Sequence, residues 1–234
     1  PLERRVQDSG AATLIVVVRD IDATLARLEG LGAPVVTRGG APVTLPFGEQ
    51  KARMVVVRDP DGHFVELVQP ERMPATAAPA TSNVVDVRVR LTVEDVEKSL
   101  RLYRDALGLE AVDEPASRDD PAVAAALGAP GAAYRIATLR VPTSGLLLEL
   151  ADFKGVDRRP VRGDIEDPGS TRMQLQVRDI DAAVAALEDL GGTVVSTDGK
   201  PLELPVPGSA IEVAIVRDPD NLFLVLIESP PRPR

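Results

Sequence analysis

The side chains that could carry chemistry are few in this chain, which has no cysteine and a single histidine, His63. The absence of cysteine removes disulfides, thiolate metal ligands and cysteine nucleophiles. His63 follows the turn at 59–62, and its acidic neighbour in sequence is Asp61, so we predict a solvated loop residue. No spacing of serine, histidine and aspartate suggests a catalytic triad, and no glycine-rich loop resembles a phosphate-binding loop before a helix.

Charged and amide side chains recur at every second residue in two predicted strands, 86–91 and 172–177. These polar positions are Arg88, Arg90, Arg172, Gln174 and Gln176. Because successive side chains on a strand point to opposite faces, the polar faces should line a cleft and the apolar faces should pack on helices. We expect a cationic pocket for a polar or anionic small molecule.

Glu149 belongs to this predicted cluster as its carboxylate. A competing interpretation is that Glu149 pairs with Arg88 or Arg172 and the cluster only fills the cleft, because a buried arginine needs a partner. In that case Glu149→Ala would strand a buried cation. Both interpretations place the same side chains in one cleft.

An internal repeat organises the elements that must position these residues. Residues 13–70 and 172–229 align without a gap at an offset of 159, with 24 identities in 58 pairs. Such a match indicates duplication of a whole unit. In the first copy, strand 12–18 precedes a helix capped by Asp20, and strands follow near 35–37, 52–58 and 63–69.

A third, more distant unit lies between the two copies. It shows the same order of strand, helix and further strands, with an alanine-rich insertion at 121–127. The predicted boundaries are a single module in 1–72, a linker in 73–82, and a complete domain in 83–230, made of modules 83–153 and 171–230 with connection 154–170.

The composition is that of an ordinary globular chain, with 44% hydrophobic and 27% charged residues among 234. The net charge of −9 argues against nucleic acid as the main partner, and aromatic residues for base stacking make up only 3%. No apolar run reaches the length of a membrane span, and no signal-peptide pattern opens the chain. We expect a cytoplasmic protein without nucleic-acid or membrane partners.

Two segments carry a resemblance to a known superfamily. Residues 95–109 (DVEKSLRLYRDALGL) and 59–67 (DPDGHFVEL), with a weaker copy at 218–226, resemble the vicinal oxygen chelate superfamily of glyoxalases, bleomycin-resistance proteins and extradiol dioxygenases. The resemblance implies an α+β fold in which tandem βαβββ modules pair into cupped mixed sheets with helices outside. It does not imply one function, since this scaffold hosts many chemistries.

The resemblance also implies four positions for a divalent metal such as zinc, nickel, iron or manganese. In domain 83–230 these positions are Arg88, Glu149, Arg172 and Val225. Arginine stays protonated and cannot act as a ligand, so we predict no metal there and no cofactor. In the first module the positions are Thr13 and Glu66, which leaves Glu66 as a possible ligand only if another module completes the site.

The first module, 12–70, has no evident sheet partner in this expected arrangement. Its cleft face would be Thr13, Ile15 and Val17, and such an apolar face is rarely left in water. We therefore expect a partner from a module of about 75 residues upstream, as the 159 offset suggests, or from a second copy in a homodimer with two Glu66 carboxylates facing one cleft.

The function we predict is binding of a polar or anionic small molecule by a protein whose metal site is degenerate. One alternative is a metal-dependent lyase, isomerase or dioxygenase that uses a site completed by a missing module. A second alternative is a non-catalytic interaction module. Similarity to drug-binding members is weakened by the scarcity of aromatic rings.

Overall fold

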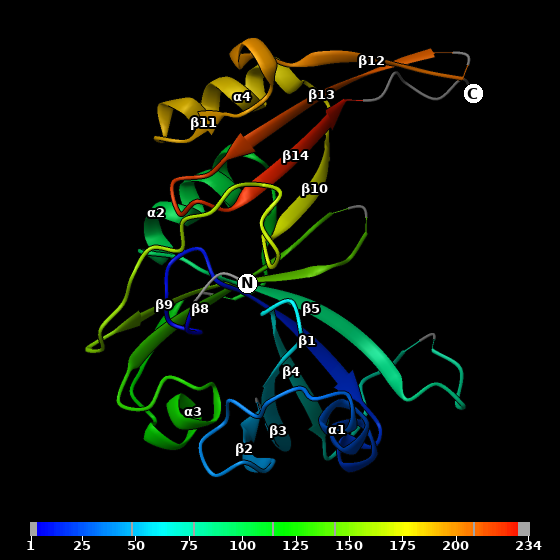
Figure 1. Cartoon of the computed structure of the whole chain (residues 1–234), viewed down its shortest axis with the longest axis vertical. Coiled ribbons are helices and arrows are strands. Elements are labelled where there is room, and N and C mark those ends of the chain that lie inside the picture. The colour runs from blue at the N-terminus through cyan, green and yellow to red at the C-terminus, as the bar shows by residue number, and fades with distance from the viewer. Residues whose placement is uncertain are drawn as a thin grey trace.

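The structure is a computed structural model that describes residues 4–228 except 48, 77, 114, 143 and 208. The sequence of residues 230–234, Pro-Pro-Arg-Pro-Arg, also predicts a disordered tail, and these residues lie outside the described part of the chain. Three βαβββ modules follow one another along the chain (Figure 1). The mixed sheets with helices on their outer faces confirm the predicted α+β fold.

The first module contains one helix and four strands. Its elements are β1 (Ala12–Val18), α1 (Ile21–Gly30), β2 (Val43–Phe47), β3 (Gln50–Arg58) and β4 (Phe64–Pro70). The Asp20 side chain accepts a hydrogen bond from the amide of Ala23 and so caps α1, as predicted. The second strand was expected at 35–37, where only Val35 forms a bridge, to Val57.

The middle module carries the alanine-rich insertion as a short helix. Its elements are β5 (Val84–Thr92), α2 (Val96–Leu100), the π-helical segment η1 (Arg101–Ala106), β6 (Glu110–Ala111), β7 (Ala116–Arg118), α3 (Pro121–Ala126), β8 (Ala133–Arg140) and β9 (Leu147–Lys154). Asp95 caps α2 by accepting from the amides of Glu97 and Lys98.

The last module repeats the plan of the first. Its elements are β10 (Arg172–Val177), α4 (Ile180–Asp189), β11 (Thr193–Val194), the 3₁₀ turn η2 (Thr197–Gly199), β12 (Leu202–Val206), β13 (Ser209–Arg217) and β14 (Phe223–Glu228). Among the described residues, no helix combines the length and the apolar character that a membrane crossing requires.

The first and middle modules share one sheet. Nine strands of the described chain form it, in the order β2-β3-β4-β1-β5-β9-β8-β6, with β7 beside β8. β1 and β5 run antiparallel at the centre, with Thr13 opposite Arg90 and Ile15 opposite Arg88 (Figure 1).

This pairing corrects the expected arrangement, in which module 83–153 shared a sheet with 171–230. The partner of the middle module is the first module, so the expectation that 12–70 needs a partner from outside this chain, or a homodimer through it, was wrong. The physical reason is the apolar face that Thr13, Ile15 and Val17 present. All three side chains are at most 5% exposed once the middle module covers them.

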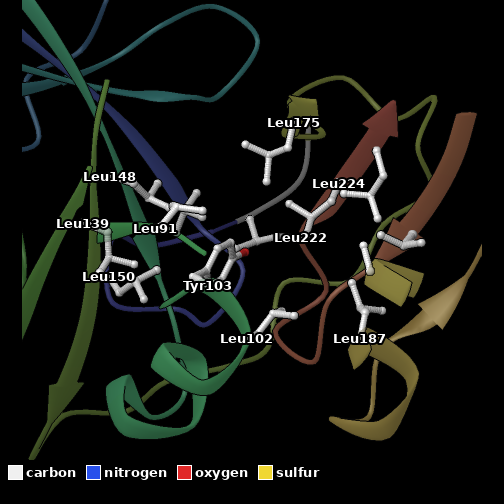
Figure 2. Packing of buried hydrophobic residues seen from close by; sticks show 14 of the residues in the cluster. Leu91, Leu102, Tyr103, Leu139, Leu148, Leu150, Leu175, Leu187, Leu222 and Leu224 are labelled. Atoms are coloured by element: carbon white, nitrogen blue, oxygen red, sulfur yellow. The ribbon is translucent and has the colours of Figure 1, made fainter. Parts of the chain in front are cut away.

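The last module packs on the middle module through helices. Its strands form a separate sheet in the order β10-β14-β13-β11, with β12 beside β13. Tyr103 and Leu102 of η1 are buried with Leu187 of α4 and with Leu222 and Leu224 in one apolar cluster (Figure 2). Modules 83–153 and 171–230 are therefore in contact, but across their helices and not across a sheet.

Two buried carboxylates anchor the last module at this contact. The hydroxyl of Tyr103 donates to Asp218 Oδ2 over 2.7 Å, and the Asp218 Oδ1 atom accepts from the amides of Asp220 and Leu222. Asp220 Oδ1 accepts from the Ser9 hydroxyl, which ties down the N-terminal segment. The sequence of residues 218–221, Asp-Pro-Asp-Asn, predicts a hairpin turn but not this anchoring role, which depends on the tertiary contact.

Burial raises the pKa of Asp218 to about 7, against the lowering effect of the Tyr103 hydrogen bond. A carboxyl group whose pKa is raised in the folded state adds stability below its unfolded pKa. That stability is lost as the pH rises through the folded pKa.

We expect the free energy of unfolding, measured in urea titrations, to fall between pH 5 and pH 8. The fall should be about 2–3 kcal/mol larger for the wild type than for Asp218→Asn. The matched control is Asp59→Asn, the half-exposed repeat equivalent, which should keep the wild-type dependence; equal pH dependence in Asp218→Asn would contradict this assignment.

Candidate functional site

The candidate site is the cup, which we define as the face of the nine-stranded sheet opposite helices α1 and α2. Val16 and Val18 of β1 face α1, whereas Ile15 lies in the apolar cluster of the other face. The insertion helix α3 supplies Ala124 and Ala126 to that same cluster. One part of the cup is therefore filled by the protein itself.

A buried guanidinium lies between two carboxylates in the cup. Arg90 Nη1 is 2.6 Å from Glu66 Oε2, and Arg90 Nη2 is 2.6 Å from Glu149 Oε2. Arg90 Nε also donates to Glu149 Oε2 over 2.8 Å. Because Glu66 comes from the first module and Glu149 from the middle one, this cluster joins both halves of the cup.

The cluster is largely dry, with the Arg90, Glu66 and Glu149 side chains 9%, 2% and 12% exposed. Burial raises the pKa of Glu66, and the positive charge of Arg90 acts against that rise. Desolvation alone would lower the pKa of Arg90, but the two carboxylates raise it above its usual value. Arg90 therefore stays charged, and burial favours the protonated form of Glu66.

The partner of Glu149 differs from the predicted one. We expected Arg88 or Arg172, but β5 and β9 pair with Arg90 beside Glu149 and Arg88 beside Leu147. Glu149 pairs with the guanidinium of Arg90, so the predicted partner, Arg88 or Arg172, was wrong. The register of β5 against β9 decides which arginine lies beside Glu149, and the sequence pattern does not specify that register.

Arg88 lies on the cup face beside this cluster and is only partly engaged. Its Nε atom donates to Asp86 Oδ2 over 3.2 Å, and its side chain is 22% exposed. Within the described part of the chain, its Nη1 and Nη2 atoms have no hydrogen-bond partner. Ile15 lies opposite Arg88 on β1, and Leu147 beside it on β9. A guanidinium edge with apolar neighbours is thus available to an acid.

The remaining predicted site residues lie elsewhere. Arg172, Gln174 and Gln176 are on β10 of the last module, where all three are exposed. Val225 is on β14 of that same separate sheet. The structure brings together Arg88, Arg90, Glu149 and Glu66, and does not bring the β10 residues to them.

The cup residues do not fit a divalent metal. With the observed module pairing, the four positions that the resemblance implies in one cup are Thr13, Glu66, Arg88 and Glu149. Only the two carboxylates are metal ligands, and the Arg90 guanidinium occupies the hydrogen-bonding position between them. Among the described residues, no group of three or more His, Cys, Asp or Glu side chains is arranged to hold a metal ion.

His63 lies outside the cup and is not the solvated residue that we predicted. It is half-buried, and its Nδ1 atom lies 3.3 Å from Nη2 of Arg4. Burial lowers the pKa of His63, and the charge of Arg4 lowers it further. The contact with Arg4 and the bond from the His63 backbone amide to Asp59 Oδ1 describe a structural residue.

A cavity of about 420 Å³ lies on the helix side, between η1 and the last module, with Leu102, Tyr103, Leu190 and Asp218 among its lining residues. It contains none of the cup side chains. A ligand role for the cup therefore depends on the free guanidinium atoms of Arg88 and not on this hollow.

Comparisons with known proteins show the family and the fold. Residues 85–225 match the family model described as a glyoxalase-like domain. A comparison with curated protein sequences gives no match.

Solved structures resemble the chain in fold. A mutant of glyoxalase I from Zea mays shares 21% identity, covering 94% of this chain and 70% of its own, with a TM-score of 0.59. A glyoxalase family protein from Bacillus cereus shares 18% identity over 64% of this chain and 98% of its own, with a TM-score of 0.53. A putative dioxygenase from Bacillus subtilis shares 14% identity over 98% and 64%, with a TM-score of 0.50.

Loss of the central cation should be costly. We expect Arg90→Met to lower the free energy of unfolding by about 3–5 kcal/mol at pH 8, because two buried carboxylates then face each other without a cation. The loss should be smaller at pH 5, where Glu66 can take up a proton. Urea titrations at both pH values measure this, and Arg53→Met, which removes the exposed pair with Asp22, is the control with a much smaller effect. A small, pH-independent change in Arg90→Met would show that the cluster is solvated.

Proposed function

Since the chain belongs to the glyoxalase-like family of the vicinal oxygen chelate superfamily, we propose that it is a metal-independent member whose cup binds a small organic acid through Arg88. The observation that carries this proposal is the half-buried guanidinium of Arg88, which uses only Nε within the described chain. A carboxylate or phosphate can accept two parallel hydrogen bonds from the other two nitrogens.

The surroundings of Arg88 define the kind of acid. Leu147, which is half-buried, lies beside Arg88 on β9, so an apolar body of a few carbon atoms can lie beside the acidic group. The Glu66 and Glu149 carboxylates are already neutralised in part by Arg90 and repel a second acidic group. A small monoacid fits this environment better than a polyacid.

The metal-dependent alternatives receive less support from the cup. A lyase, isomerase or dioxygenase of this superfamily would need a cation that polarises substrate oxygen. Here the cation beside Glu66 and Glu149 is a guanidinium, which donates hydrogen bonds and offers no open coordination position. We therefore propose binding, and not metal-assisted catalysis, as the role of this cup.

The test is a thermal-shift and calorimetric titration with acetate, butyrate and citrate. We expect a monoacid to raise the melting temperature of the wild type by about 2 °C or more, since ligand that binds only the folded state stabilises it. Arg88→Ala should lose this response, and Arg172→Ala, which removes an exposed arginine of the separate sheet, should keep it. An equal response in Arg88→Ala, or none from any acid in the wild type, would refute the proposal.

The metal-independent part of the proposal has its own measurement. We expect zinc, nickel, iron and manganese to be far below one equivalent in purified protein by elemental analysis, and their addition to leave the melting temperature unchanged. The reason is that a dication must displace the Arg90 guanidinium from two carboxylates. Stoichiometric metal that is lost in Glu66→Gln would show that the cup holds a metal after all.

A further inference from the structure

The repeat allows the same sheet face to be compared in two environments. In the first module, the cup face of β2, β3 and β4 is buried beneath the middle module. At these positions Leu45, Ala52, Met54, Val56, Glu66 and Val68 are at most 8% exposed. The residues 159 positions later, on β12, β13 and β14, are Leu204, Ile211, Val213, Ile215, Val225 and Ile227, and each is partly or fully exposed.

The first strand of the last module shows the same contrast. Thr13, Ile15 and Val17 of β1 are buried, whereas Arg172, Gln174 and Gln176 at the equivalent positions of β10 are exposed. β10 is the end strand of its sheet, with β14 as its neighbour in the described chain. The last module thus presents an open strand edge beside an apolar sheet face, and both features are seldom left free in solution.

The contact between β1 and β5 provides a template for covering this edge. Leu14 lies opposite Val89, and each is six residues before the capping aspartate of its module, Asp20 or Asp95. The contact therefore has two-fold symmetry, with equivalent residues of two modules facing each other. In the last module, the residue six positions before the capping Asp179 is Met173.

We propose that a second copy of this chain covers the last module, with β10 pairing antiparallel to β10 of the second copy around a two-fold axis at Met173. The first and middle modules already cover each other, so the last module is the part of a second copy that has a matching free edge. The five-stranded sheets of the two last modules would join into one ten-stranded sheet and form a second cup.

Side-chain complementarity supports this register. Met173 opposite its own copy places Arg172 opposite Gln174 of the second copy, so that a guanidinium meets an amide oxygen on each side of the axis. A register shifted by one residue towards Arg172 would place the two arginines opposite each other, and like charges in directly opposed positions are destabilising. In this dimer, the apolar faces of β13 and β14 from both copies would line one shared cup.

The test uses charge at a single exposed position. Sedimentation equilibrium of the full chain should show a reversible dimer. Gln174→Arg should raise the dimer dissociation constant by roughly tenfold, because it places two guanidiniums opposite each other on both sides of the axis. Gln174→Glu should lower it by a similar factor, because each new carboxylate faces Arg172 of the second copy.

Two controls separate this pairing from a general effect of charge. Gln176→Arg adds the same charge but lies opposite residue 170 in the proposed register, so its effect should be small. The double variant Arg172→Glu/Gln174→Arg should restore the dimer. All these side chains are exposed, so melting curves should show that the variants fold. A monomeric wild type, or equal effects of Gln174→Arg and Gln174→Glu, would overturn the proposal.

Discussion

The central constraint of this structure is the position of one positive charge between two modules. Arg90 lies in a dry cup and needs carboxylates, and Glu66 and Glu149 each need a cation. Removing Arg90 leaves two buried carboxylates without a cation, and removing either carboxylate leaves one side of the guanidinium without its acceptor. A buried ion cluster is a weak source of net stability, but breaking it by removing one partner is costly. The cluster therefore helps to decide which module the middle one accepts.

The two copies of the repeat differ at the position that matters for this choice. Glu66 of the first module corresponds to Val225 of the last, and Ile15 corresponds to Gln174. If the last module paired with the middle one through its sheet, Val225 would leave one side of Arg90 without a carboxylate. Glutamines would also replace the apolar face that β1 buries. Charge and burial both favour the first module.

Much of the fold could be predicted from the sequence, because local signals encode it. The 58-residue repeat at an offset of 159, the helix cap at Asp20 and the alternating polarity of β5 indicate modules of strand, helix and further strands. The family itself is shown by the match of residues 85–225 to the glyoxalase-like model. The pairing of modules could not be read in the same way. Strand and helix patterns state which face is apolar, but the partner depends on register and tertiary contact, as Asp218 and Tyr103 also show.

The candidate site could be predicted only in part, because the sequence shows which side chains share a strand face but not which modules pair. The sequence placed Arg88, Arg90 and Glu149 on one face, and that face is the cup. It grouped Arg172 with them only because the expected module pairing was different. A guanidinium held by two carboxylates has its hydrogen-bond donors turned towards them, whereas a neighbouring guanidinium with free nitrogens can hold an acid. The chemistry of this cup therefore follows from the pairing of its modules. The guanidinium of Arg90 is bound by Glu66 and Glu149, and the Nη1 and Nη2 atoms of Arg88 remain available to a ligand.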